Sequence, residues 1–244
     1  MKIKNLTVKK AEKEVLKNIN LELTDNTISV IMGANGCGKT TLANTIVGNP
    51  DCIVVSGEIV FGGMDLLKME TFEIALNGVY LSPQNPIEIN GLSNAAFLKH
   101  AVNAKRKFLG QDEVDEFEFL KLLKEKAKEF YFEPKDYIRH SFNVGYSGGE
   151  KKRNEMLQIS LLQPKLIILD EVDSGLDLDM FKKVKKFLLE YKENGGTILM
   201  VTHNPKFIEN IGVDKVFLMK DGSVKKEGDS KLIDYVANHG FGDL

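Results

Sequence analysis

The sequence is short of several features, and each shortage excludes a class of protein. It has only two cysteines, Cys37 and Cys52, with no C-x-x-C pair and no histidine nearby at metal spacing. We therefore expect neither a disulfide framework nor a structural zinc site, and we expect a reducing compartment. No apolar run approaches the roughly 20 residues of a membrane span, and the N-terminus lacks the apolar stretch of a signal peptide. These observations favour a cytoplasmic protein without membrane insertion, or a stromal one if a plastid transit peptide has been removed.

The chain also lacks an excess of charge of either sign. Its formal net charge is −2, which argues against a nucleic-acid-coating protein, so no nucleic acid is expected as a partner. Proline is scarce, with 6 residues, while 43% of the 244 residues are hydrophobic. This composition is ordinary for a globular protein with a sizeable core, and it predicts a single domain over residues 1–244.

Hydrophobic patterning changes twice along the chain. Residues 1–91 are rich in strand patterns, including the continuous apolar run ISVIM. Residues 92–163 carry apolar residues three and four apart among charges, which predicts helices. In residues 164–244, apolar runs such as LIILD and TILMV alternate with amphipathic segments, which favours a doubly wound parallel sheet. The helical block is thus predicted to be an insertion between two parts of one α/β core.

The segment GANGCGKT matches the phosphate-loop pattern G-x-x-x-x-G-K-[ST], and it lies between an apolar strand and a helical segment. Its glycines let backbone N–H groups surround phosphates, and the helix N-terminus adds its dipole. Lys39 would reach the β- and γ-phosphates, and Thr40 would bind Mg²⁺. Cys37 contributes mainly its N–H, with redox sensing as the alternative. The candidate phosphate-binding residues are Gly33, Ala34, Asn35, Gly36, Cys37, Gly38, Lys39, Thr40 and Thr41.

Polar residues follow three further apolar runs, where strand ends line the ligand crevice of a parallel sheet. The run LIILDE ends in Asp170 and Glu171. Asp170 suits an outer-sphere partner of Mg²⁺, and Glu171 suits a base that orients or deprotonates the attacking water. The alternative is that this acid pair caps the following helix. His203 ends TILMVTH within reach of a γ-phosphate, although a histidine after a strand is often structural. Gln84, after GVYLS, could contact Mg²⁺ or the water.

Ser147 admits two interpretations. GYSGG fits the G-x-S-x-G elbow of serine hydrolases, and Asp170 and His203 follow in the order of a hydrolase triad. A nucleophile elbow needs a strand directly before the serine, and the preceding DYIRHSFNVGY is a poor strand. SGGE instead fits a helix N-cap with a capping box, whose free N–H groups would bind a phosphate. We therefore predict a phosphate-binding role for Ser147, Gly148, Gly149 and Glu150.

Together these segments resemble the ordered motifs of the ATP-binding-cassette (ABC) ATPases. They correspond to the Walker A loop, Q-loop (Gln84), signature (Ser147 to Glu150), Walker B with catalytic Glu171, D-loop (SGLD, ending at Asp177) and switch His203. The resemblance implies an α/β P-loop domain with a mixed sheet core (1–91 and 164–244), an N-terminal antiparallel β region and an inserted helical subdomain (92–163). It also implies ATP and Mg²⁺ as ligands and Thr40, Gln84 and Asp170 at the metal. Two copies would pack head to tail, with Asp177 linking their sites.

Within that family the sequence resembles the SufC branch, the ATPases of SUF iron–sulfur cluster assembly. The segments that carry this similarity are NVGYSGGEKKRNEMLQ, LDEVDSGLDLD, QNPIEINGLSN and HGFGDL. The resemblance implies a SufB/SufD-type scaffold as partner, or a SufB homodimer, which closure of two ATP-bound copies would remodel.

Some alternatives stay open at this point. The nucleotide-binding subunit of an ABC importer, and a clamp that binds ATP without hydrolysing it, carry the same motifs. An aromatic residue for adenine stacking is missing near Lys10, which leaves only the Lys10 stem and Val15 for apolar contact. The basic run behind the signature consists of Lys151, Lys152 and Arg153. It forms either a solvated helix face, or it supplies a lysine that pairs with Glu171 and keeps this base inactive until a partner binds.

Overall fold

The computed structural model describes residues 1–130, 137–138, 140–171, 178–209 and 211–242. They form two compact units. Unit 1 comprises Met1–Gln84, Lys165–Ser174 and Lys185–Leu244, and unit 2 comprises Asn85–Pro164 and Gly175–Val184. The predicted helical subdomain, residues 92–163, falls within the first segment of unit 2.

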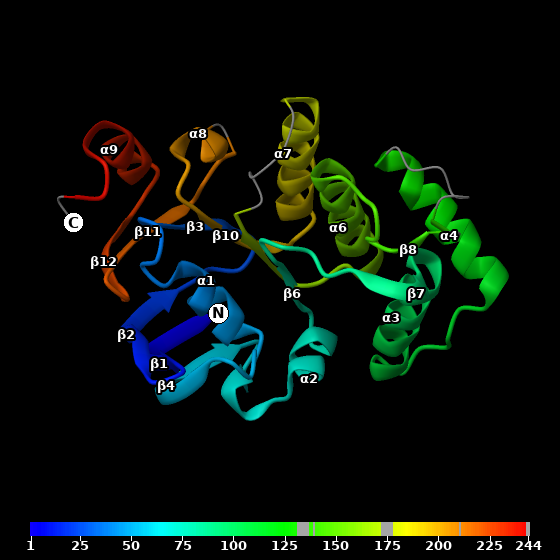
Figure 1. Cartoon of the computed structure of the whole chain (residues 1–244), viewed down its shortest axis with the longest axis horizontal. Helices are drawn as coiled ribbons and strands as arrows, with labels where there is room; N and C mark the ends of the chain where they lie inside the picture. Colours follow the sequence, from blue (N-terminus) through cyan, green and yellow to red (C-terminus); the bar gives the residue numbers. More distant parts are fainter. Residues whose placement is uncertain (131–136, 139, 172–177, 210, 243–244) are drawn as a thin grey trace. The chain divides into compact units, whose positions relative to one another are not determined.

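A six-stranded mixed sheet forms the centre of unit 1, in the order β12-β11-β3-β10-β9-β6 (Figure 1). All neighbours pair in parallel except β11 and β12, so the predicted mixed core is confirmed. Every residue of β3, β9 and β10 is buried, as expected for continuous apolar strands covered on both faces. The strands are β3 (Ile28–Met32), β6 (Val79–Ser82), β9 (Leu166–Asp170), β10 (Thr197–Thr202), β11 (Lys215–Lys220) and β12 (Ser223–Gly228).

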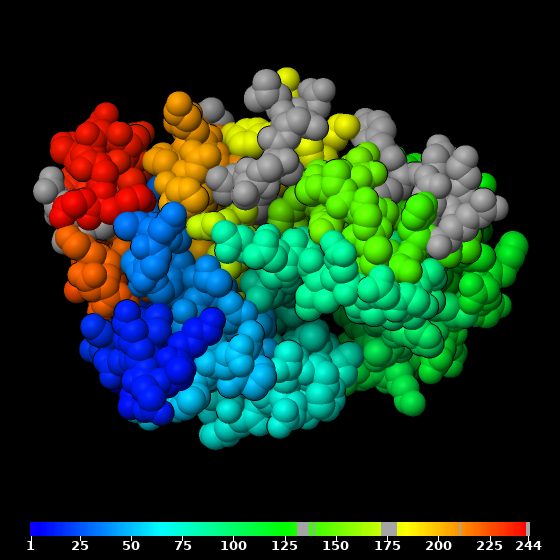
Figure 2. Space-filling model, viewed as in Figure 1, coloured from blue at the N-terminus to red at the C-terminus, as the bar shows by residue number. Residues whose placement is uncertain are grey.

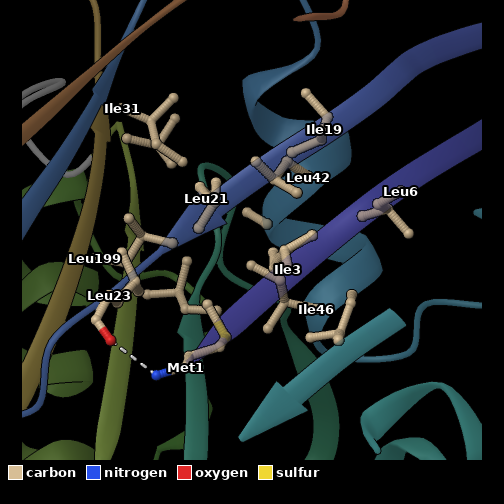
Figure 3. Close-up of a cluster of buried hydrophobic side chains, with 14 of the residues drawn as sticks. Met1, Ile3, Leu6, Ile19, Leu21, Leu23, Ile31, Leu42, Ile46 and Leu199 are labelled. Atoms are coloured by element: carbon tan, nitrogen blue, oxygen red, sulfur yellow. Dashed lines mark hydrogen bonds between the residues drawn. The ribbon is translucent and has the colours of Figure 1, made fainter. Parts of the chain in front are cut away.

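The predicted N-terminal antiparallel region is also confirmed, as a four-stranded sheet of order β2-β1-β4-β5. Its apolar side chains pack against α1 (Lys39–Ile46) and against the larger sheet, as Figure 3 shows for Ile3, Leu42 and Leu199. Burial of each such side chain contributes about 1.5–3 kcal/mol, so this core holds α1 firmly. The strands are β1 (Lys2–Lys10), β2 (Lys13–Glu22), β4 (Ile53–Phe61) and β5 (Met64–Asp65).

A two-residue turn joins β11 to β12, as the Asp-Gly pair predicts. Asp221 and Gly222 both have positive φ, at 51° and 78°, which suits the twist of a tight hairpin. Strand β12 also contacts β2, and the orange and blue segments adjoin in the space-filling view (Figure 2). The remaining short elements of unit 1 are η1 (Leu66–Lys68), α2 (Thr71–Leu76), α8 (Pro205–Ile208) and α9 (Lys231–His239).

In the part of unit 2 that the structure describes, α3 and α4 both contact α6. Their apolar faces are buried, and serine and aspartate N-caps begin α3 and α4. A small antiparallel pair, β7–β8, was not anticipated from the sequence, because each strand is short and only weakly alternating. The elements are β7 (Ile89–Ser93), α3 (Asn94–Phe108), α4 (Glu116–Glu129), β8 (Ser141–Phe142) and α6 (Gly148–Leu162).

Helix α7 (Leu178–Glu193) has residues in both units. Throughout the described ranges, none of the helices combines the length and the apolarity that crossing a membrane requires.

Candidate functional site

The phosphate loop connects β3 to α1, as its context predicts. A Cβ at Gly33 would lie 2.4 Å from the carbonyl oxygen of Met219 and 2.6 Å from Cys37 Sγ, so only glycine fits there. Gly36 and Gly38 have φ of 79° and 108°, a left-handed backbone that glycine adopts without strain. Local packing and backbone geometry therefore both require the glycines of this loop.

Lys39 occupies the loop that it is predicted to serve. Its side chain is buried, and Nζ donates hydrogen bonds to the carbonyl oxygens of Gly33 (2.8 Å) and Ala34 (3.1 Å). Both acceptors are neutral, so the ammonium charge has no carboxylate among these partners. The arrangement presents a positive charge at the N-terminus of α1, where an anion is favoured.

Support for the loop comes from the β11–β12 turn, which sequence reasoning identified only as a hairpin. Gly222 N donates to the Cys37 carbonyl oxygen (3.1 Å), and Lys17 N donates to the Gly222 carbonyl oxygen (2.8 Å). A Cβ at Gly222 would lie 2.2 Å from the Val15 carbonyl oxygen. This role could not be found locally, because the turn is about 185 residues away from Cys37 along the chain.

Cys37 is buried inside the loop beside Gly33. Burial raises the pKa of its thiol, an effect larger than the opposing influence of Lys39. The thiolate is the reactive form, so this environment favours a packing role over redox sensing.

The predicted metal ligands Thr40 and Asp170 lie together. Asp170 is buried at the end of β9, and Thr40 Oγ1 donates to its Oδ1 at 3.2 Å. Hydroxyl, carboxylate and amide oxygens are the ligands that Mg²⁺ prefers, and Gln84 supplies the amide. The residues present therefore fit the predicted ion.

Gln84, Glu171 and His203 converge at the ends of three adjacent strands, β6, β9 and β10. Gln84 Nε2 donates to Glu171 Oε2 (2.6 Å), and His203 Nδ1 lies 3.1 Å from Glu171 Oε1. Glu171 has a left-handed backbone with φ of 50°, and its N–H bonds to the Val201 carbonyl oxygen. A non-glycine residue in this conformation costs about 1 kcal/mol. Both oxygens of the candidate base are therefore occupied, and one must be released before it can accept a proton from water.

A cavity of about 280 Å³ is lined by the phosphate loop together with Gln84 and Glu171, and all of its lining residues belong to unit 1. Val15 lines it, whereas Lys10 is exposed at the end of β1 and is not part of its described lining, so the predicted apolar contact with adenine stays a prediction. The lining residues are Val15, Asn35, Gly36, Gly38, Lys39, Thr40, Thr41, Gln84 and Glu171.

Ser147 belongs to unit 2 and begins α6 with the predicted capping box. Its Oγ accepts from Glu150 N (3.4 Å) and donates to Glu150 Oε2 (2.6 Å), while Ser147 N donates to the same carboxylate (2.9 Å). These hydrogen bonds from Ser147 lower the pKa of Glu150. The strand β8 is only two residues long and turn residues separate it from Ser147, so a nucleophile elbow is not formed.

Gly148 and Gly149 differ from the glycines of the phosphate loop. Neither has a positive φ, and apart from the chain neighbours and the backbone of α6 itself, no described residue places an atom within 4 Å of a Cβ built at either position. Packing inside the described chain therefore does not explain why both positions are glycine.

The basic run behind the signature is not simply a solvated face. Lys152 is only 5% exposed and pairs with Glu155 (2.6 Å), which corrects that expectation, and Lys151 pairs with Glu88 (2.5 Å). In the described residues, the carboxylate of Glu171 is held by the side chains of Gln84 and His203 rather than by Lys151 or Lys152. Asp177 lies outside the described residues, so its linking role stays a prediction.

Comparison with known proteins places these features in a family. The sequence model of the ABC transporter family matches residues 16–174. "Probable ATP-dependent transporter SufC" of Escherichia coli is 38% identical over 100% of this chain and 98% of its own length. "Vegetative protein 296" of Bacillus subtilis is 40% identical over 98% of this chain and 90% of its own length. A solved ATP-binding cassette, in a dimeric post-hydrolysis state with ADP and Pi, has a TM-score of 0.77 at 24% identity, covering 94% of this chain and 98% of that chain.

Proposed function

Because this chain belongs to the ABC ATPase family, it is an ATPase, and we propose that it drives a SUF-type iron–sulfur cluster assembly complex. In this proposal two copies close head to tail on ATP and remodel a SufB/SufD-type scaffold in the cytoplasm or in a plastid stroma. The similarity to the E. coli relative named SufC, which runs along the full length of both chains, supports this role over a general transporter role.

One observation carries the catalytic part of the proposal. Gln84, Glu171 and His203 meet at the edge of the sheet beside the cavity lined by Lys39 and Thr40. A phosphate chain bound along the N-terminus of α1 would bring its γ-phosphate to this edge. The cavity then holds a cation, oxygen ligands for Mg²⁺ and a base, and the imidazole of His203 lies against that base.

In the proposed reaction, Lys39 leaves the carbonyl oxygens of Gly33 and Ala34 and binds the β- and γ-phosphates. Glu171 exchanges one of its hydrogen bonds for a water molecule and takes the proton as that water attacks the γ-phosphorus, releasing ADP and phosphate. His203 stabilises the charge that develops on the γ-phosphate. Mg²⁺ held by Thr40, Asp170 and Gln84 would neutralise charge on the β- and γ-phosphate oxygens.

The second copy is needed for the role assigned to Ser147. The open space at Gly148 and Gly149 lets a ligand approach the backbone N–H groups of α6 closely. A phosphate of the nucleotide held by another copy is the ligand that the family resemblance implies, with Asp177 linking the sites. Hydrolysis would remove this bridge and reopen the dimer, so that ATP acts as a closure switch.

Two alternative functions would use the same nucleotide-binding residues. An importer subunit would bind a membrane permease in place of a scaffold, and a clamp would bind ATP without releasing phosphate. The presence of Glu171 and His203 in the cavity region favours hydrolysis over the clamp.

The test is phosphate release by the purified chain with and without the SufB/SufD-type scaffold of the same organism, with Glu171→Gln as the inactive control. We expect the scaffold to bind and to raise the rate severalfold in the wild-type chain only. Absence of binding, together with recovery of a membrane permease in a pull-down analysed by mass spectrometry, would favour the importer subunit instead.

A further inference from the structure

Three buried asparagines in unit 2 form a hydrogen-bonded cluster that the reaction does not use directly. Asn94, Asn143 and Asn154 are each at most 2% exposed. Asn154 Nδ2 donates to the Oδ1 atoms of Asn94 (2.9 Å) and Asn143 (2.6 Å), and its own Oδ1 accepts from the hydroxyl of Tyr137 (2.9 Å). Burial raises the pKa of Tyr137, so the phenol stays protonated and remains a donor. We call Asn94, Asn143 and Asn154 the amide cluster.

The amide cluster joins the segment after Gln84 to both sides of the signature. Asn143 Nδ2 donates to the Ile87 carbonyl oxygen (2.8 Å), three residues beyond Gln84. Asn94 Nδ2 donates to the hydroxyl of Tyr146 (3.1 Å), the residue directly before Ser147. Asn154 lies on α6 itself, less than two turns beyond its N-cap.

A surface ion pair makes the same connection a second time. Lys151 of α6 pairs with Glu88, the neighbour of Ile87, at 2.5 Å. The side chain of Ile87 is 69% exposed, so its carbonyl is anchored inside while its apolar side chain faces outward. A displacement of residues 85–88 therefore acts on α6 through a buried connection and an exposed one.

Energetics favour a positioning role for these amides. A buried amide costs free energy unless it is hydrogen-bonded, and apolar side chains of similar volume often stabilise a core equally well or better. A fully connected polar network instead restricts its members to one arrangement. Asn143 has a φ of 59°, a left-handed conformation that asparagine and glycine both adopt readily, so glycine can replace it without changing the backbone.

We propose that Asn143 and Asn154 are positioning residues that make residues 85–88 and the N-terminus of α6 move as one body. A shift of Gln84 in the nucleotide site is then passed along three peptide bonds to Ile87 and through the amide cluster to Ser147. This inference rests on the proposed function, because it assumes that the Ser147 end of α6 closes on the nucleotide of a second copy.

The test uses Asn143→Gly in a Glu171→Gln background, where ATP should hold the closed dimer. Glycine keeps the left-handed backbone and removes only the amide. Asn26→Gly controls for the backbone change alone, because Asn26 also has a positive φ (60°) but is exposed and lies outside the cluster. Sedimentation velocity over a range of ATP concentrations gives the dimerisation midpoint, and a fluorescent ATP analogue gives nucleotide affinity in the monomer.

We expect Asn143→Gly to raise the ATP midpoint for dimerisation by about tenfold, with monomer nucleotide affinity unchanged and no effect of Asn26→Gly. Equal midpoints for the two glycine variants would overturn the inference while leaving the proposed function intact. A Glu171→Gln parent that stays monomeric at saturating ATP would instead overturn the proposed dimer, and this inference with it.

A second variant covers the case in which Asn143→Gly does not fold. Asn154→Leu removes the centre of the cluster, and Leu157→Ala, a buried apolar loss in the same helix, controls for destabilisation. We expect Asn154→Leu, and not Leu157→Ala, to raise the ATP midpoint for dimerisation while the nucleotide affinity of the monomer stays unchanged. Parallel behaviour of these two variants would assign the cluster a purely structural role.

Discussion

The N-termini of α1 and α6 are both glycine-rich and both predicted to bind phosphate, yet they are built differently. At α1, Gly33 and Gly38 are required by this chain's own packing and backbone geometry, and Lys39 adds a positive charge. At α6, Ser147 and Glu150 close a capping box, while the glycine positions face open space among the described residues. The glycines of α1 are explained within the chain, whereas in our proposal those of α6 meet a nucleotide bound to a second copy.

This difference teaches how to separate structural from functional glycines. A glycine that avoids a clash or adopts positive φ is explained by the fold that contains it. A glycine that does neither is explained by something that approaches it, here a phosphate of a second copy in our proposal. Five substitutions, grouped in four predictions, test the contrast, from the largest expected effect to the smallest.

Glu171→Gln should greatly slow ATP hydrolysis in the site at the N-terminus of α1, and it should leave ATP-dependent dimerisation through the N-terminus of α6 intact. Loss of a positioned base lowers kcat by about 10²–10⁴-fold, whereas the phosphate loop keeps its contacts. Phosphate release should fall by that amount, while ATP should drive the variant into a stable dimer by size-exclusion chromatography. Hydrolysis at the wild-type rate would show that Glu171 is not the base.

Gly33→Ala and Gly149→Ala should have opposite effects on stability. The Gly33 Cβ meets backbone 2.4 Å away, which should lower the free energy of unfolding by about 1–3 kcal/mol. Gly149→Ala lies in open space within a helix, so stability should stay the same or rise by up to about 1 kcal/mol. Its kcat should nevertheless fall by about ten- to a hundredfold.

Urea unfolding and phosphate-release assays on the two variants measure these effects. If Gly149→Ala retains full activity, the open space at α6 has no role in closure and the contrast between the two helix ends fails.

Ser147→Ala should cost about 1 kcal/mol of stability, because it removes an N-cap. Ser93→Ala is the matched control, since Ser93 caps α3 through the amide N–H of Ala96 (3.2 Å) and touches no proposed catalytic group. Both variants should unfold at similarly lower urea concentrations, and only Ser147→Ala should also lose ATP-dependent dimerisation. Similar dimerisation by both would limit Ser147 to capping.

Glu150→Gln should have the smallest effect, seen in the pH dependence of stability. Ser147 lowers the pKa of folded Glu150 below its ordinary value of 4.5. The carboxylate therefore stabilises the folded state above about pH 4.5, and this contribution is lost as pH falls through the lower folded pKa. The difference in unfolding free energy between wild type and variant should shrink between pH 7 and the acid range. A difference that is constant with pH would contradict this assignment.

Much of the site could be predicted because its residues occur at strand ends. Gln84, Glu171 and His203 each follow an apolar strand, and parallel strands bring their carboxyl ends to one edge of a sheet. The Walker pattern and the capping box are likewise local, since spacing alone defines them. Lys152 was misjudged because periodicity along α6 does not reveal which charged side chain is buried against its own partner, Glu155.

By itself, the sequence determined the family, the mixed α/β core and the identity of the residues that carry the phosphate-binding patterns. It could do so because these features depend on neighbours a few positions away. Only the tertiary structure decided that Glu171 adopts a left-handed backbone with both oxygens engaged, that Gly222 hydrogen-bonds to the phosphate loop, and that three buried asparagines form one hydrogen-bonded cluster. These contacts join residues that are far apart along the chain, and no local propensity encodes which of them will meet.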